Sequence, residues 1–323
     1  MGSINSISSY LGDTNKVEEI LSKYENKINE KDINGYNYLM IATNEGKLKI
    51  VKLLWGKGVK INDQDNYGYS PLMIASEKGH EDIVTFLLEK GANIDLKTKF
   101  GDNALMIATQ FNKIKIVELL LKFKATIHEK NSDGFDAITM GTQKGYFLIV
   151  KLLLENGADP NSKSNGNSLL IYACEKGYVK IAKLLLESGA NIHEVDIYGW
   201  SPIMIASGFG QIEIIKLLLL KGANIHVKTA NGFNCLMAAS HANYIETVKF
   251  LLSKKIDVNA KTIDGFNGLM FASEFGHTQV IELLLSSGAN IHEKNLDNET
   301  ALIIASKNSH KNLVNYFLLN GAL

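Results

Sequence analysis

The sequence predicts an all-α repeat solenoid, a fold in which one small helical repeat is stacked on copies of itself. Three observations indicate it: a turn glycine recurs every 33 residues or so, a helix-capping residue follows each turn, and two apolar helical segments follow each cap. The turn position is occupied by Gly35, Gly68, Gly101, Gly134, Gly166, Gly199, Gly232 and Gly265, and by Asn298 in the last repeat. Because each repeat of such a stack buries its apolar face only against its neighbours, function is expected on a long surface and not in a catalytic cavity.

Each repeat begins with a turn and a helix cap, as residues 65–97 illustrate. Asp65 to Gly68 is expected to form a tight turn, in which Gly68 is free to adopt a positive φ. Ser70 follows as an N-cap whose hydroxyl accepts from the first free N–H groups of a helix, and Pro71 takes the first helical position, where its missing N–H does no harm. A suitable cap occurs in every repeat, at Asn37, Ser70, Asn103, Asp136, Ser168, Ser201, Asn234, Asn267 and Thr300.

Two helices and an arm complete the repeat. The first helix is predicted over 71–78 and ends at Gly79, where the chain reverses into a second helix. Apolar residues of the second helix fall on one stripe that faces the first helix and the next repeat, namely Ile83, Val84, Leu87 and Leu88. Gly91 is expected to end this helix in the left-handed conformation, and residues 92–97 to run outward as a strand-like arm to the next turn.

Together these residues resemble the ankyrin repeat. The resemblance rests on the turn glycine, the capped Ser-Pro-Leu stretch, the Gly-His pair that opens the second helix, its paired leucines and the Gly-Ala-Asn-Ile stretch that ends residues 68–94. It covers nine full repeats from residue 32 to the C-terminus, and residues 4–31 resemble a degenerate first repeat because Ile20 and Leu21 match Leu53 and Leu54 one period later. We therefore predict a degenerate capping repeat over 1–31 and a single continuous domain of ankyrin repeats over 32–323.

One departure from the family pattern is a methionine in the first helix, where the family usually has histidine. It is found at Met40, Met73, Met106, Met204, Met237 and Met270. A soft-metal path or an adaptable binding surface is conceivable, but a single position per repeat on a packed helix favours a role in filling the core. The loss of the histidine removes a helix-to-turn hydrogen bond seen in the family, so we expect apolar packing to hold these hairpins.

Two repeats lack glycine at two of the expected positions. Asn112 and Asn243 stand at the turn between the helices, and Lys124 and Lys255 stand where the second helix should end in glycine. Lysine in the left-handed conformation costs roughly 1 kcal/mol relative to glycine, so these repeats are predicted weak points of the stack. One residue is also missing before Gly166, which is expected to shorten that hairpin.

Composition argues against several classes of function. The 34 basic residues are all lysine and balance 34 acidic residues, with no arginine to grip a phosphate with two hydrogen bonds and no basic region for nucleic acid. Cys174 and Cys235 are too few for a disulfide framework or a thiolate metal site. No segment has the length and apolar character of a transmembrane helix. We expect a cytoplasmic monomer without a cofactor.

No catalytic constellation is found, so an enzyme is not expected. Gly208-Phe209-Gly210 is a lone Gly-x-Gly without a preceding strand, and no phosphate loop, zinc-protease or serine-hydrolase motif occurs. Histidine recurs at one arm position, which is occupied by His128, His193, His226 and His292 and elsewhere by Asn62, Asp95, Asn161 and Asn259. Repeats spaced by roughly 8–10 Å cannot bring such residues together on a metal, so we predict a shared hydrogen bond within the hairpin. The resemblance adds that hydroxylation at this position occurs in the family.

Aromatic residues gather where the ankyrin family holds its partners, at the hairpin tips and the exposed side of the first helices. The residue after the turn glycine is aromatic in six repeats, at Tyr36, Tyr69, Phe135, Trp200, Phe233 and Phe266. Further aromatic residues precede that glycine or end the first helix, at Tyr67, Phe100, Tyr198, Phe111, Phe209 and Phe275. Large rigid rings in a row are typical of interface hot spots, so all twelve are candidate partner-binding residues.

The sharper hypothesis concerns the C-terminal part of this set. We expect an apolar groove for an extended peptide or helix, built from Tyr198, Trp200, Phe209, Phe233, Phe266 and Phe275. The alternative is that the rings after the glycine pack on neighbouring hairpins and only stiffen the stack.

A separate feature is the N-terminal pattern Met-Gly-x-x-x-Ser, which fits N-myristoylation at Gly2. One myristoyl chain gives marginal membrane binding, and no lysine cluster or nearby cysteine supplies a second signal. A chance match to a short pattern is the commoner explanation.

The leading hypothesis is a non-enzymatic protein-interaction module or scaffold that binds a partner protein or peptide through its concave surface. One alternative is a regulatory effector or inhibitor that occludes a partner enzyme. Another is the ankyrin segment of a larger enzyme or channel.

Overall fold

The computed structural model describes residues 13–23 and 28–322, and the chain divides into two compact units, Met1–Asp159 and Pro160–Leu323. The first unit contains α2 (Thr14–Lys23), α3 (Tyr38–Asn44), α4 (Leu48–Gly56), α5 (Pro71–Lys78), α6 (Glu81–Glu89), α7 (Ala104–Gln110), α8 (Ile114–Lys122), α9 (Ala137–Lys144) and α10 (Phe147–Glu155). The second contains β1 (Lys163–Ser164), β2 (Asn167–Ser168), α11 (Leu169–Lys176), α12 (Val179–Glu187), α13 (Pro202–Gly208), α14 (Ile212–Leu220), α15 (Cys235–His241), α16 (Ile245–Ser253), α17 (Gly268–Glu274), α18 (Thr278–Ser286), α19 (Ala301–Lys307) and α20 (Lys311–Leu319). Gly2 lies outside the described residues.

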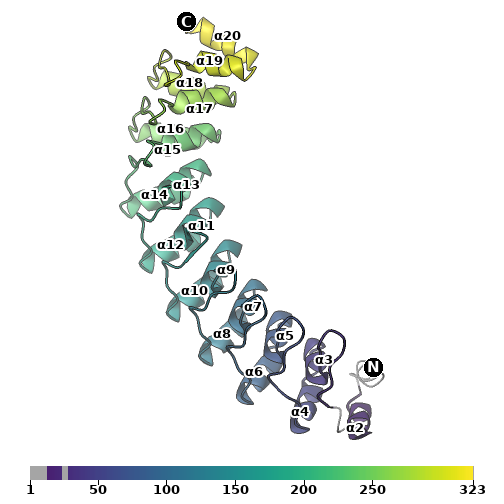
Figure 1. The fold of residues 1–323 in the computed structure, drawn as a ribbon. Coiled ribbons are helices and arrows are strands. Elements are labelled where there is room, and N and C mark those ends of the chain that lie inside the picture. Colours follow the sequence, from purple (N-terminus) through teal and green to yellow (C-terminus); the bar gives the residue numbers. More distant parts are fainter. Residues whose placement is uncertain (1–12, 24–27, 323) are drawn as a thin grey trace. The chain divides into compact units, whose positions relative to one another are not determined.

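Within each unit the helices form two layers (Figure 1). The first helices of successive repeats lie side by side, as α3, α5, α7 and α9 do in the first unit and α11, α13, α15, α17 and α19 do in the second. The second helices form the other layer in the same order. The predicted class, an all-α repeat solenoid, is confirmed, while the number of repeats and the division into 1–31 and 32–323 stay predictions.

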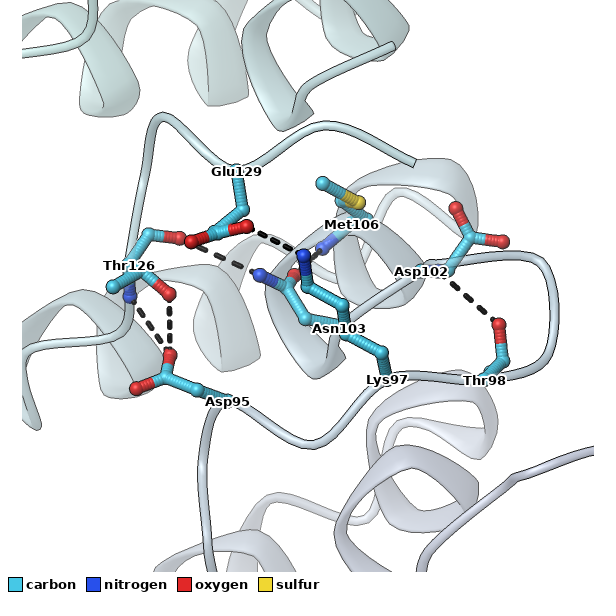
Figure 2. Close-up of polar contacts among 8 residues, drawn as sticks. All are labelled: Asp95, Lys97, Thr98, Asp102, Asn103, Met106, Thr126 and Glu129. Atoms are coloured by element: carbon cyan, nitrogen blue, oxygen red, sulfur yellow. Dashed lines mark hydrogen bonds and ion pairs between the residues drawn. The ribbon is translucent and has the colours of Figure 1, made fainter. Parts of the chain in front are cut away.

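The predicted caps start the first helices. Asn103 Oδ1 accepts from the backbone N–H of Met106 at 3.0 Å, and Asn103 Nδ2 lies 3.5 Å from the carbonyl of Thr126 in the following arm (Figure 2). The same cap bond, to the third helical residue, is made by every predicted cap except Ser201. The Ser201 hydroxyl is buried without a hydrogen-bond partner, so its helix begins with one cap bond fewer than its neighbours.

The methionines fill the core, as predicted. All six are at most 1% exposed and lie in the first helices, among the buried leucines and isoleucines. Met73 also replaces the missing histidine in part, because its sulfur accepts a hydrogen bond from the backbone N–H of Ser70 at 3.5 Å. A thioether is a weak acceptor, so apolar packing remains the main contribution of this residue.

The arms differ from the prediction in two ways. They are not strands: among the described residues, strand geometry is confined to β1 and β2, apart from a single bridge between Lys228 and Asn234. The predicted hydrogen bond within the hairpin is also wrong, because the arm side chain bonds to the next repeat. Asp95 Oδ1 accepts from the backbone N–H of Thr126 at 3.1 Å (Figure 2), and the same bond joins Asn62 to Asn93, Asn161 to Asn191 and Asn259 to Asn290.

The physical reason lies at the end of the second helix. Ala92 N donates to the Leu87 carbonyl and closes the helix, which leaves the N–H of Asn93 as the first without a helical acceptor. A short polar side chain from the preceding arm supplies that acceptor. The four arm histidines are exposed on their arms.

The deletion before Gly166 has the predicted local effect. β1 and β2 are antiparallel and pair Ser164 with Asn167, so only Asn165 and Gly166 remain in the turn. Both have positive φ, 50° and 79°, which is what a tight two-residue hairpin requires.

The two lysines predicted to be strained do adopt positive φ, 66° at Lys124 and 58° at Lys255. Lys124→Gly should therefore stabilise α8 against local opening by roughly 1 kcal/mol. Lys122→Gly, within α8, should destabilise it by about 0.5–1 kcal/mol. Native-state hydrogen exchange of the α8 amides measures both changes in local stability. A change of the same sign in the two variants would contradict backbone strain at Lys124.

Removal of the cap side chains should have unequal effects. Asn103→Ala should destabilise α7 by about 1 kcal/mol, because the Met106 N–H loses its acceptor. Ser201→Ala removes a hydroxyl that makes no cap bond, so we expect little change at α13. Hydrogen exchange of the two helices compares them directly, and a large loss at Ser201→Ala would show that the hydroxyl is bonded.

Candidate functional site

The second unit positions Trp200 through a rigid turn. Asp196 Oδ1 accepts from the backbone N–H of Trp200 at 2.8 Å, and Asp196 N donates to the Trp200 carbonyl at 3.0 Å. The indole then lies over Gly208 at the end of α13. A Cβ on Gly208 would be 3.3 Å from the Trp200 ring and 3.5 Å from the Cβ of Ala238. The ring therefore rests on the one residue of α13 that has no side chain, and Ala238 of the neighbouring α15 lies close to the same glycine.

From Trp200 the rings continue into the next repeats. Trp200 stacks on Phe233 with a centroid distance of 5.0 Å, and Phe233 meets Phe271 edge to face at 5.3 Å. Phe266 contacts the same Phe271 at 5.5 Å. Such pairs each stabilise by about 0.5–1.5 kcal/mol beyond their burial, so the rings hold one another in place.

A histidine extends the run along the first helices. His241 contacts Phe271 at 6.1 Å and Phe275 at 4.7 Å, both edge to face. His277 stacks on Phe275 at 5.8 Å, and its Nε2 lies 3.0 Å from the His241 carbonyl. Burial lowers the pKa of His277, and the neighbouring His241 and His310 side chains lower it further. The bond to the His241 carbonyl acts in the opposite direction and raises the pKa. We call the set Trp200, Phe233, His241, Phe266, Phe271 and Phe275 the aromatic cluster.

The structure brings together four of the six residues predicted for the C-terminal groove, Trp200, Phe233, Phe266 and Phe275. Tyr198 and Phe209 are 76% and 42% exposed, and in the described part of the chain neither makes a ring contact with the cluster. Phe271 and His241 were missed by the sequence analysis. A signal existed for Phe271: it stands four residues after its cap, the position of the buried Ile74 and Ile107, so it places an aromatic ring on the first helix beside the residues after the turn glycine.

Both interpretations of the rings after the glycine find support in the second unit. Trp200, Phe233 and Phe266 are half-buried, and the stacking of Trp200 on Phe233 connects two neighbouring hairpins, as the stiffening role requires. Phe275 keeps 48% of its surface exposed, and Tyr198 and Phe209 add exposed rings on the repeat of Trp200. The cluster is thus a preorganised apolar surface with uncovered ring area.

The first unit does not build a comparable cluster. Tyr36, Tyr69 and Phe135 are half-buried, whereas Tyr67, Phe100 and Phe111 are 60%, 59% and 43% exposed. Among the described residues no ring contact joins any two of these six. Burial raises the pKa of Tyr36 and of Tyr69; nearby carboxylates, Asp65 at Tyr36 and Glu77 at Tyr69, raise each further.

The two thiols and the metal-ligating side chains offer no second site. Burial raises the pKa of Cys235 to about 12 and that of Cys174 still further, which keeps both protonated and unreactive. Over residues 13–23 and 28–322 no group of three His, Cys, Asp or Glu side chains is placed to hold a metal ion. The same residues include no helix that is both long enough and apolar enough to cross a membrane.

The fold and this surface define a helical repeat protein. A comparison with protein-family models matches ankyrin repeats, described as three copies per model, over residues 6–98, 94–164, 170–262 and 236–322. The chain belongs to the ankyrin-repeat family, whose repeats are protein-interaction modules. A search of curated proteins finds no significant match.

The position of the Trp200 ring depends on the missing side chain at Gly208. Gly208→Val should push the indole off α13, with the loss of about 0.5–1.5 kcal/mol of stacking and a shift of its emission to longer wavelength. The measurement uses a Trp55→Phe background, so that Trp200 is the only fluorophore of its kind. Gly56→Val, at a helical glycine with open space around it, is the control that should leave the emission unchanged.

Proposed function

We propose that this chain is a non-enzymatic adaptor that binds an extended segment of a partner protein on the aromatic cluster of its second unit. The observation that carries the proposal is the continuous run of ring contacts from Trp200 to Phe275 with ring area left exposed. We further propose that it acts as a monomer in the cytoplasm, without a cofactor.

The energetics of such a surface favour binding. Aromatic rings supply large contact areas with few rotatable bonds, and they dominate the binding energy of most protein interfaces. Because the rings of the cluster already hold one another, little side-chain freedom is lost when a partner docks. The adjacent exposed rings of Tyr198 and Phe209 enlarge the surface that a partner covers.

The repeat geometry favours an extended segment over a helix. Neighbouring helices pack roughly 8–10 Å apart, and a chain extended as polyproline II advances about 3.1 Å per residue with about three residues per turn. Every third side chain of such an extended segment therefore points the same way and meets the next repeat. We expect a partner sequence with apolar side chains at this spacing.

Trp200→Ala should weaken partner binding by about 2 kcal/mol, or about thirtyfold in Kd. The partner segment is selected from a displayed library of random peptides with the full chain as bait, and its Kd is measured by calorimetry. Trp55→Ala, a half-exposed tryptophan on α4 outside the cluster, is the matched control and should leave Kd unchanged.

A different pattern would assign the rings to stability alone. If Trp200→Ala lowers the unfolding temperature while the selected peptides bind as before, the cluster only stiffens the stack. Selected peptides without apolar residues at every third position would likewise count against the extended mode.

A further inference from the structure

The residues that follow the turn glycine in successive repeats form a column, and in the first unit one carboxylate interrupts the aromatic residues of this column. The residue after the turn glycine is Tyr36, Tyr69, Asp102 and Phe135 in four successive repeats. Asp102 is half-buried, and its Oδ1 accepts from Asn131 Nδ2 at 2.9 Å. Asn131 belongs to the hairpin of Phe135, whose backbone N–H donates to Asn131 Oδ1 at 2.9 Å. The carboxylate is thus anchored at the boundary between its own hairpin and the next.

This carboxylate is poorly compensated. Its side chain points away from Thr98 and from the arm contacts of its repeat (Figure 2). In the described part of the chain no lysine lies within ion-pair distance of it, and one neutral amide is its hydrogen-bond donor. Burial raises the pKa of Asp102, and the charge of Asp133 raises it further. The hydrogen bond from Asn131 lowers this pKa and so acts in the opposite direction. A charge that has lost part of its water without a counter-charge favours an external cation.

The same column contains an internal comparison in the second unit. Glu299 also follows the turn position, and it forms an ion pair with Lys307 of its own repeat. Lys307 stands seven residues after the cap Thr300, and the residue seven after the cap Asn103 is Gln110, which is uncharged and exposed. The repeat of Asp102 therefore lacks the cation that the repeat of Glu299 supplies.

The surroundings of Asp102 suit a flat cation. Tyr69 lies close enough to Asp102 and Glu77 for both carboxylates to raise its pKa, after the larger effect of burial. Glu77 is paired with Lys78 at 3.0 Å, so that lysine compensates Glu77 and not Asp102. The half-buried rings of Tyr69 and Phe135 occupy the column positions on either side of the carboxylate.

We propose that Asp102, between Tyr69 and Phe135, binds an arginine side chain of a partner protein. The guanidinium group pairs with a carboxylate through two parallel hydrogen bonds and stacks on aromatic rings, which an ammonium does less well. The chain itself has no arginine, so the group comes from another molecule. The site is on the first unit and is independent of the aromatic cluster.

The test titrates the full chain with the probe peptide acetyl-Ala-Ala-Arg-Ala-Ala-amide and follows backbone and Asn side-chain amides by NMR. Saturable shifts are expected at Asp102, Asn131 and Phe135. The same peptide with citrulline in place of arginine keeps the shape without the charge and should bind about tenfold more weakly or worse. Asp102→Asn should cause a similar loss.

Gln110→Lys provides a second variant that does not remove the carboxylate. It restores the arrangement of Glu299 and Lys307, so the new lysine should compete with the probe peptide for Asp102 and weaken its binding several-fold. Gln110→Met is its neutral control, and Asp133→Asn removes a nearby exposed charge of the same sign. Both should bind the probe within about twofold of the unchanged chain, since neither touches the ion pair.

Equal binding of the citrulline peptide, or unchanged binding by both Asp102→Asn and Gln110→Lys, would overturn the proposal. A lysine peptide that binds as well as the arginine peptide would overturn the assignment to arginine. Trp200→Ala should leave the probe affinity unchanged, so failure here and failure of the aromatic cluster are separate results.

Discussion

The stack depends on backbone groups that one repeat leaves unpaired and the next repeat satisfies. The first N–H beyond each of four second helices is bound by an arm side chain of the preceding repeat, as Asn62 binds Asn93. The end of the first helix shows the converse: His277 Nε2 lies 3.0 Å from the carbonyl of His241, and His310 Nε2 lies 2.9 Å from that of Glu274. Since helix ends without partners are costly, the repeats joined by these bonds are not satisfied alone, and order spreads from neighbour to neighbour.

What could be predicted from the sequence follows from the range of the interactions. Caps and turns join residues three or four positions apart, so the side chain at Asn103 and the positive φ at Lys124 were predictable from local chemistry. The contacts of the arms join residues about one repeat apart, and the alternation of Asn, Asp and His did not reveal their partner. The strand-like arm failed for the same reason, because the arm bonds to its neighbour through side chains instead of a backbone ladder.

The aromatic cluster shows a similar limit. The column of rings after the turn glycine could be counted in the sequence, but Phe271 and His241 lie on the first helices and join the cluster only through packing. The space for Trp200 was equally hidden, since Gly208 is an ordinary helical residue until the indole is placed against it. Trp200 stacks on Phe233, which is 33 positions away, and only the register of the stack relates the two rings.

The same register explains why specific sites arise in a repetitive fold. Equivalent positions share a backbone environment. The functional difference between two repeats therefore depends on whether the side chains at two such positions of one repeat complement each other. Glu299 and Lys307 are matched and neutralise each other within their repeat. Asp102 and Gln110 occupy the equivalent positions of their own repeat. The acidic residue is present there but the basic residue is not, so a half-buried charge stays unneutralised. Since a half-buried charge without a counter-charge destabilises the free chain and strengthens a complementary complex, the mismatch favours binding at one repeat and leaves the fold of the others unchanged.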